Sequence, residues 1–267
     1  MSTLTRFLTA SLSLAFLASS LSFAAEPTKV GKFFVSTVKG KAVFSAGNSI
    51  EPLEEKATFP AQGVIFESMS DGTCILVFSN NTGVHVASST RFEVKRFVQA
   101  PFAANRNDIE MEPSVSTTAV NVEKGSVAIC SSKLVAGSIM SYQTPHASIA
   151  LRVRRVLIEV SETSTLVSLL EGEATIRRGG DKDAGGQVLR AGQQMIITVS
   201  GPGATPVSEV RDIPGEALEQ IGNRVAEACM ARSTVFFDTG EPTGEVTATP
   251  TSPTNPVPTT VSNAVQQ

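Results

Sequence analysis

Hydrophobic residues recur along this chain mainly with a period of two, in short runs separated by turn residues. Residues 32–44 contain two such runs around Lys39-Gly40, and residues 64–78 contain two more around the turn Ser70-Asp71-Gly72. Alternation buries one face of a strand, and glycine after a polar residue is a frequent turn signal between paired strands. The pattern therefore predicts a β hairpin at each of these two places.

The same pattern continues to residue 199, with turn residues arriving roughly every eight to twelve residues. That spacing is typical of a sandwich, a barrel or a rolled sheet, whereas βαβ units would need helical segments between the strands. We predict an all-β domain over residues 30–210, with rolled or sandwiched sheets of short, mostly antiparallel strands. Its later strands are expected at residues 115–129, 133–135, 139–143, 149–160, 165–170, 173–177, 187–189 and 195–199.

One segment departs from the period-two pattern. Residues 212–233 carry apolar side chains at a spacing of three or four residues, which places them on one stripe of an α-helix. Asp212 stands where its side chain could cap the first turn. We predict an amphipathic helix that packs against the β domain, with a partner protein as the alternative packing surface. The expected stripe consists of Leu218, Ile221, Val225 and Ala228.

The first 25 residues have the layout of a secretory signal peptide. Arg6 precedes an apolar and hydroxyl-rich run at residues 7–21, and small residues end the segment at Ala24 and Ala25. An uncleaved membrane anchor is the alternative, but serines interrupt the run and it is shorter than the roughly 20 apolar residues of a spanning helix. We expect cleavage of residues 1–25, no integral membrane span afterwards, and a mature protein in the periplasm or secreted.

Residues 238–267 are dominated by proline, threonine, glycine, serine and valine. Such a composition buries too little apolar surface to offset the entropy lost on ordering. We predict a flexible, disordered tail over these residues.

The charge of the chain limits its partners. It has 22 Lys and Arg residues against 25 Asp and Glu residues, a formal net charge of −3, and the two signs are mixed along the sequence. A protein that binds nucleic acid or an anionic membrane usually carries a basic patch, so we expect neither partner. Arg152, Arg154 and Arg155 form the one local basic cluster. Because Arg152 and Arg154 alternate with Val153, we interpret the cluster as a solvated strand face rather than a phosphate site.

Three cysteines occur in a chain that we expect to be exported. The odd number leaves at least one thiol unpaired or paired between chains. Cys74 and Cys130 both lie in β-type segments and could bridge neighbouring strands. Three inert thiols are the alternative, and the spacing excludes a compact Cys-x-x-Cys motif.

The sequence predicts no catalytic, cofactor-binding or metal-binding residues, and hence a protein that is not an enzyme. His85 and His146, the only histidines, lie within or beside β-type runs and are interpreted as structural. Asp181 and Asp183 lie in a glycine-flanked turn that lacks the other ligands of an EF-hand loop, so we predict a hairpin connection rather than a calcium site. Hydrolase elbow, zinc-protease and phosphate-loop motifs are absent. The chain has no Trp and a single tyrosine, Tyr142, which disfavours a carbohydrate site.

Five short elements follow one another in a recognisable order. An Asp-Gly turn leads to a strand with a small polar turn. A Thr-Pro segment then enters an alternating strand, and a Glu-Gly turn and a Gly-Gln turn follow. This order resembles the FecR-like periplasmic domain over residues 38–200. The matching residues are Asp71-Gly72-Thr73, Ser88-Ser89-Thr90 to Val94, Thr144-Pro145, Leu170 to Thr175, and Ala191-Gly192-Gln193.

The resemblance stops at one step of the alternating strand. The family carries Arg-Gly-Thr there, where this chain has Arg152-Val153-Arg154, and a glycine inside a strand marks a bulge or a close backbone approach. In the family's regulators the domain hangs in the periplasm from a membrane helix, receives a signal from an outer-membrane transporter and controls a sigma factor through a cytoplasmic domain. Here a signal peptide stands in that position, so the resemblance does not imply the sigma-factor function.

Together these features predict an exported, non-enzymatic, FecR-like bacterial module that binds a protein or an envelope component, with signalling as a role. A partner could add a strand to an exposed sheet edge. A structural envelope or surface protein, in which the tail is a spacer, is the first alternative. A hydrolase with an unrecognised site is the second. The partner, the oligomeric state and the strand topology are left open.

Overall fold

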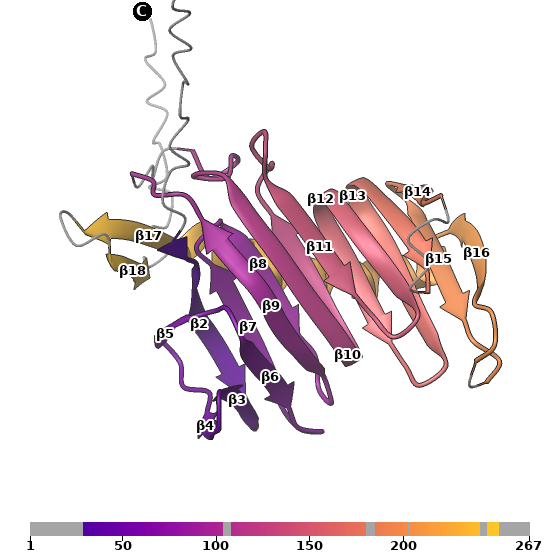
Figure 1. Cartoon of the computed structure of the whole chain (residues 1–267), viewed down its shortest axis with the longest axis horizontal. Coiled ribbons are helices and arrows are strands. Elements are labelled where there is room, and N and C mark those ends of the chain that lie inside the picture. Colours follow the sequence, from indigo (N-terminus) through magenta and orange to yellow (C-terminus); the bar gives the residue numbers. More distant parts are fainter. Residues whose placement is uncertain (1–28, 104–107, 180–184, 202, 241–244, 251–267) are drawn as a thin grey trace, which may run out of the picture.

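The computed structural model (Figure 1) describes residues 29–103, 108–179, 185–201, 203–240 and 245–250. The predicted signal peptide, residues 1–25, lies outside these ranges. Within them, sixteen strands join in one hydrogen-bonded sheet, and one helix, α1 (Gly215–Thr234), lies against it. No helix in this part of the chain has both the length and the apolar character needed to cross a membrane. The prediction of an all-β fold with one C-terminal helix is confirmed.

The sheet folds over itself into two layers. The first layer consists of β4 (Ser49–Pro52), β3 (Ala42–Ala46), β6 (Val64–Ser68), β9 (Arg91–Gln99) with β1 (Lys29–Val30), the start of β10 (Ser116–Ser131), β11 (Ile139–Gln143), the start of β12 (Ala147–Val160), the end of β13 (Ser164–Arg178), and β14 (Gln187–Arg190). The second layer consists of β5 (Thr58–Pro60), β2 (Lys32–Lys39), β7 (Thr73–Phe78), β8 (Thr82–Val86), the end of β10, the end of β12, the start of β13, β15 (Gln193–Thr198) and β16 (Val207–Asp212).

Three long strands, β10, β12 and β13, belong to both layers. β10 pairs with β9 and β11 along its first part and with β8 and β12 along its last part. Likewise, β13 pairs with β15 near its start and with β14 further along. The pairing of β10 with β11 is parallel, and the other strand pairs are antiparallel. Strands that pass from one layer to the other therefore give the sheet its rolled, sandwiched form.

Two predicted hairpins are instead corners between the layers. Lys39-Gly40 leads from β2 to β3, and Ser70-Asp71-Gly72 leads from β6 to β7, but neither pair of strands is hydrogen-bonded together. The two corners stack: Met69 N donates to Lys41 O at 2.9 Å, and a Cβ atom on Gly72 would lie 2.0 Å from the same oxygen. Only glycine permits so close an approach of two backbones. Alternation shows which face of a strand is buried, and it does not show which strand is its neighbour.

Phenylalanine side chains fill the core between the layers. Phe33 of β2 lies 4.8 Å from Phe66 of β6, and Phe78 of β7 lies 5.5 Å from Phe97 of β9, measured between ring centroids. Both pairs have edge-to-face geometry, which adds an aromatic attraction to the gain from burying apolar area. These contacts hold the two layers together in the N-terminal half of the sheet.

Helix α1 covers the outer face of the second layer, over β7, β8 and β10. Ile221, Val225 and Ala228 are buried there, as the predicted stripe requires, whereas Leu218 is 42% exposed and does not belong to it. The helix lies very close to β8, because a Cβ atom on Gly83 would be 2.0 Å from Ala228 O. The backbone of α1 thus packs directly against the backbone of β8 at Gly83.

The predicted helix cap at Asp212 is wrong. Asp212 is the last residue of β16 and faces Gln193 of β15. Main-chain bonding continues one residue further, where Ile213 N donates to Gly192 O at 2.9 Å. The helix then begins after Pro214, which makes no side-chain cap. Asp212, which the sequence pattern placed at the helix start, therefore belongs to the sheet through its pairing with Gln193.

The chain continues from α1 into β17 (Val235–Gly240) and β18 (Glu245–Pro250), which form a separate two-stranded sheet. Val235 and Phe237 are buried against Phe34 and Val77 on the outer face of the second layer. The predicted tail, 238–267, thus includes the end of β17 and the whole of β18. Its remaining residues lie outside the described ranges.

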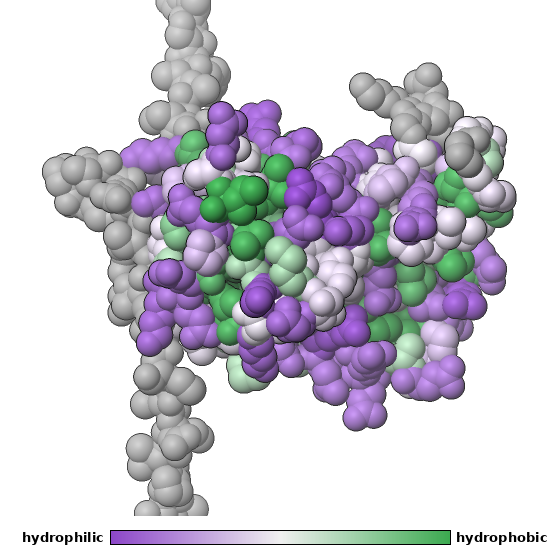
Figure 2. Space-filling model, turned by 90° about the horizontal axis from the view of Figure 1, so that it is seen from below, coloured by the Kyte–Doolittle hydropathy of each residue, from purple (hydrophilic) through white to green (hydrophobic). Residues whose placement is uncertain are grey.

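The surface seen from below is mostly hydrophilic, and its apolar side chains appear in separate areas rather than in one patch (Figure 2). The large apolar side chains that are exposed are distributed over strands, loops and α1, for example Ile50 of β4, Ile139 of β11 and Met230 of α1. Apolar residues exposed singly are normal and do not mark a binding site.

Candidate functional site

A β bulge in β12 brings two consecutive arginines to the same part of the surface. The register of β12 with β13 shifts between Val153 and Arg155, so Arg154 is an additional residue in β12. Regular alternation would place Arg154 and Arg155 on opposite faces, but a bulge breaks that alternation. Both guanidinium groups consequently lie 3.4 Å from Glu171 of β13. Arg152 and Arg155 are exposed, as expected of a solvated strand face, but the regular alternation of the strand ends at Arg154.

These two arginines line a cavity of about 410 Å³ together with Arg232 of α1. Glu110 forms ion pairs with Arg154 and, at 3.5 Å, with Arg232. Three cationic side chains therefore surround the space with only two carboxylates. We call it the arginine cavity, and its lining consists of Ile109, Glu110, Cys130, Arg154, Arg155, Glu171, Cys229, Arg232 and Ser233.

Arg232 is a buried cation at the end of α1. Its Nη1 donates to Ile109 O at 2.7 Å and to Ser132 Oγ at 3.1 Å. Burial lowers the pKa of Arg232, and repulsion from Arg154 and Arg155 lowers it further. The Nε groups of Arg232 and Arg154 have no hydrogen-bond partner within the described part of the chain. The surroundings thus leave the positive charge of this cavity incompletely compensated.

A second hollow, of about 630 Å³, adjoins the arginine cavity and shares Arg154 and Glu171 with it. Lys133, Arg152 and the loop of residues 134–138 also line it. The two spaces together present five cationic side chains and two carboxylates, although the whole chain has a net charge of −3. The positive charge is therefore local.

Residues 108–113 separate the arginine cavity from an apolar pocket on their other side, and they are firmly anchored. Ile109 O accepts three hydrogen bonds, from Asn81 Nδ2 at 2.7 Å, from Ser132 Oγ at 3.0 Å and from Arg232 Nη1 at 2.7 Å. These donors come from the turn before β8, from the residue that follows β10 and from α1. One carbonyl group thus joins the helix and the sheet at the rim of both spaces.

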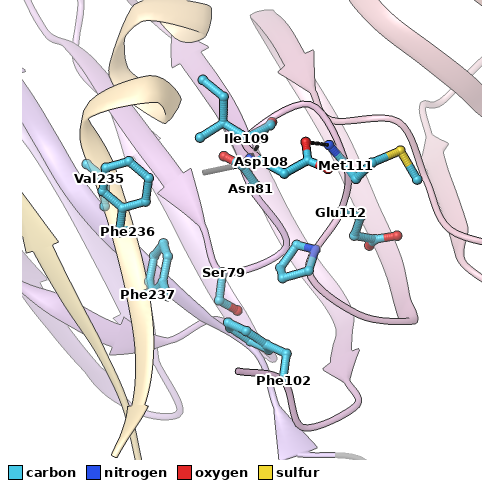
Figure 3. Close-up of a pocket in the computed structure, with 11 residues that line it drawn as sticks. Ser79, Asn81, Phe102, Asp108, Ile109, Met111, Glu112, Val235, Phe236 and Phe237 are labelled. Atoms are coloured by element: carbon cyan, nitrogen blue, oxygen red, sulfur yellow. Dashed lines mark hydrogen bonds between the residues drawn. The ribbon is translucent and has the colours of Figure 1, made fainter. Parts of the chain in front are cut away.

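The apolar pocket has a volume of about 120 Å³. In Figure 3, Phe236 and Phe237 of β17 lie opposite Asp108 and Met111, and Phe102 closes the lower end. The volume is well below the roughly 300 Å³ at which small-molecule sites begin. We therefore read this pocket as a packing gap between the β17–β18 hairpin and the body of the sheet.

Two carboxyl groups, Glu112 and Asp108, line this pocket, and both are already engaged. Burial raises the pKa of Glu112, although hydrogen bonds from Ser116 Oγ and Val135 N partly oppose that shift. Asp108 Oδ1 accepts hydrogen bonds from two backbone N–H groups of its own loop. Because the pocket is small and both groups have partners, we assign no chemistry to the pair.

One end of the large sheet is formed by β16. It pairs with β15 on one side, and within the described residues no strand pairs with its other side. Val207, at its start, is 64% exposed, and Glu209 and Arg211 are exposed further along. The edge therefore presents main-chain donors and acceptors beside a mixture of apolar and charged side chains.

The disulfide joins Cys130 of β10 to Cys229 of α1, with their Cα atoms 5.1 Å apart. Both possibilities considered from the sequence, a bridge between Cys74 and Cys130 and three inert thiols, are therefore wrong. The two faces of the second layer explain this. Cys74 is buried in the core between the layers, whereas Cys130 belongs to the cluster under the helix. Burial raises the pKa of the free Cys74 thiol to about 12.

Both histidines contact neighbouring elements. His146 Nδ1 lies 2.9 Å from Thr165 Oγ1, and its Nε2 lies 3.3 Å from Glu162 O. His85 of β8 lies 3.5 Å from Glu227 of α1, and burial lowers its pKa. Neither histidine lines the arginine cavity.

The glycine-rich turn with Asp181 and Asp183 lies outside the described residues. The strands on both sides of it pair as the sequence predicts, with Ala174 facing Leu189 across β13 and β14. Within the described ranges, no group of three or more His, Cys, Asp or Glu side chains is placed to hold a metal ion.

Sequence reasoning found Arg154 and Arg155 but missed the other charged residues of the cavity, Glu110, Glu171 and Arg232. Two signals were available. Two adjacent arginines interrupt a period-two run, which indicates a bulge. Arg232 continues the apolar stripe of α1 four residues after Ala228, and a charged residue at a buried position usually has a partner.

No protein-family model matches the chain, and no curated protein matches it. Among solved structures, the chain is similar to two crystal structures of a candidate anti-sigma factor from Parabacteroides distasonis. One has a TM-score of 0.40 and 11% identity, and the match covers 55% of this chain and 60% of that chain. The other has a TM-score of 0.39 and 9% identity, with coverages of 70% and 99%. Likeness of this size carries no argument about family or function.

Proposed function

We propose that this chain is an exported, non-enzymatic β module that binds another protein of the bacterial envelope, as part of a signalling assembly, by adding a partner strand to β16. The observation that carries the proposal is the outer edge of β16, which no described strand covers. In strand addition, main-chain hydrogen bonds give affinity and alternate side chains give specificity. The layout of residues 1–25 supports export.

The hydrogen bonding of β16 to β15 identifies the groups that would meet a partner. Ile213 N donates to Gly192 O, on the β15 side. Backbone N–H groups alternate in direction along an antiparallel strand, so those of Arg211 and Glu209 also face β15. The N–H groups of Val210 and Ser208 then face outward. A partner strand would receive its hydrogen bonds from these two residues.

The side chains along the edge would restrict the choice of partner. Glu209 and Arg211 are exposed and opposite in charge, and Val207 offers an apolar contact at the start of the strand. Charged side chains on an edge discourage pairing with unrelated strands. We expect the partner segment to carry complementary charges in this spacing.

The test is a proline substitution at an outward N–H group. Ser208→Pro removes one donor and obstructs the approach of a strand, and Ser208→Ala keeps the donor and serves as the matched control. A partner is first identified by cross-linking in envelope extract, and its affinity is then measured with purified protein. We expect at least about tenfold weaker binding for Ser208→Pro and unchanged binding for Ser208→Ala.

Two outcomes would contradict the proposal. Unchanged partner binding by a folded Ser208→Pro variant would exclude β16 as the binding edge. Repeated failure to recover any protein partner with the wild-type chain would exclude the binding function itself. Hydrogen exchange adds an independent readout, because the N–H groups of Ser208 and Val210 should exchange more slowly in the complex.

A further inference from the structure

We propose that the arginine cavity binds the phosphate or sulfate group of a ligand. Arg154 and Arg155 reach the cavity from β12, and Arg232 reaches it from α1. Each guanidinium group presents several N–H donors in one plane, an arrangement that matches the oxygen atoms of such anions. The bulge in β12 and the end of α1 thus bring donors together from segments that are far apart in the sequence.

The two carboxylates of the cavity leave part of this donor capacity unused. Arg155 approaches Glu171 through Nε at 3.4 Å, which is longer than the roughly 2.7–2.9 Å of a charge-assisted hydrogen bond. Its side chain is 52% exposed, so its Nη groups can be reached. Arg154 shares Glu171 with Arg155 and shares Glu110 with Arg232. An oxyanion could therefore accept hydrogen bonds from Arg155 without first displacing a strong pair, whereas Arg154 Nη2 already donates to Glu110.

Arg232 contributes a charge that is already desolvated and fixed in place. Its side chain is 6% exposed and is held by Ile109 O and Ser132 Oγ. Repulsion from Arg154 and Arg155 adds to the effect of burial in lowering its pKa. A negative group in the cavity would relieve that repulsion, and donors that are already ordered lose little conformational freedom on binding.

The adjoining hollow indicates the size of the ligand. Arg154 and Glu171 line both the hollow and the arginine cavity, and Lys133 and Arg152 also line the hollow. A molecule that places one anionic group among the arginines could extend a second polar or anionic group over this hollow. The class of ligand is thus a phosphorylated or sulfated molecule larger than the inorganic ion.

The disulfide supports the site directly. Cys130 and Cys229 line the cavity, and their bond attaches the end of α1 to β10. Arg232 lies three residues after Cys229, and Arg155 faces Cys130 in the register of β10 with β12. The covalent link therefore fixes the two sources of positive charge relative to each other.

The test measures binding of inorganic phosphate, sulfate and pyrophosphate to the purified chain by titration calorimetry at low ionic strength, with chloride as the reference anion. Arg155→Gln removes an accessible donor and should weaken binding about tenfold, whereas Glu171→Gln removes a competing carboxylate and should strengthen it by a similar factor. Arg178→Gln is the matched control, because Arg178 is exposed at the other end of β12 and β13, facing Ala147.

The opposite signs of the two variants make the test specific. Tighter binding of pyrophosphate than of phosphate, weaker binding by Arg155→Gln and unchanged binding by Arg178→Gln would support the site. Absence of binding to the wild-type chain would overturn the proposal. Equal affinities for wild type, Arg155→Gln and Arg178→Gln, each with an unchanged melting temperature, would also overturn it. Ser208→Pro should bind the anions normally, so the failure of this proposal is distinguishable from failure of strand addition at β16.

Discussion

Arg154 shows how one additional residue in a strand alters the chemistry of a surface. In a regular strand, Arg152 and Arg154 would share one face and Arg155 the other. The bulge instead brings Arg154 and Arg155 to the same carboxylate, Glu171, and toward Arg232. The FecR-like pattern has glycine one position before Arg154. Here the strand is bulged without glycine in β12, and Gly172 lies in the facing strand.

The free thiol of Cys74 should be unreactive in the folded protein. It is buried, and burial raises its pKa to about 12, so almost no thiolate is present at neutral pH. We expect no alkylation by iodoacetamide under native conditions and one label per chain after denaturation without reductant, as counted by mass spectrometry. Cys74→Ala should remove that label. Native labelling of Cys74, or more than one label before reduction, would contradict the prediction.

His85 should make the protein less stable in mild acid. Burial, the largest cause, lowers its pKa in the folded state below the ordinary value of 6.5, and Glu227 opposes the shift. The unfolded state therefore binds the proton more readily, and this contribution to stability is present above about pH 6.5 and is lost as the pH falls through that value toward the folded pKa.

Urea unfolding at several pH values tests this. His85→Gln should show a shallower loss of unfolding free energy between neutral pH and pH 5 than the wild type. Glu227→Gln should show a steeper loss, because it removes the carboxylate that partly stabilises the protonated ring. Identical slopes in all three proteins would contradict the assignment.

At the scale of elements, the attachment of α1 to the sheet depends on Gly83. Gly83→Ala would place a Cβ atom 2.0 Å from Ala228 O, so the helix or the strand would have to shift. We expect a loss of about 1–3 kcal/mol of unfolding free energy. Gly222→Ala, in α1 itself, is the control, because nothing lies within 4 Å of its added methyl group. That variant should be neutral or more stable by up to about 1 kcal/mol.

Chemical denaturation of both variants measures the difference. Equal stability of Gly83→Ala and the wild type would mean that the helix is not seated on β8 as described. The disulfide lies beside this contact, because Cys229 directly follows Ala228, so the comparison is made with the disulfide intact in every variant.

The strands and their buried faces could be predicted from the sequence, but their neighbours could not. Alternation is a local property of the chain, so it identifies the strands and the all-β class. The corners at Gly40 and Gly72 look like hairpin turns because the same residue type serves both purposes. Whether such a turn returns along its own layer or crosses to the other depends on contacts that are distant in sequence.

At the scale of the whole molecule, the same limit applies to the arginine cavity. Its five charged residues come from three places in the chain: Glu110 from the loop before β10, Arg154, Arg155 and Glu171 from β12 and β13, and Arg232 from α1. No local pattern connects them. The two layers and the helix have to form before these charges meet, and sequence reasoning could identify only the adjacent arginines.

The second layer of the sheet also separates the Cys74 thiol from Cys130. Cys74 lies on its inner side and Cys130 on its outer side, under α1. A chain that has not yet formed this layer exposes three cysteines that can pair in three ways. Once the layer has formed, Cys130 can reach only Cys229. The order of sheet formation and oxidation therefore decides which of these bonds can form.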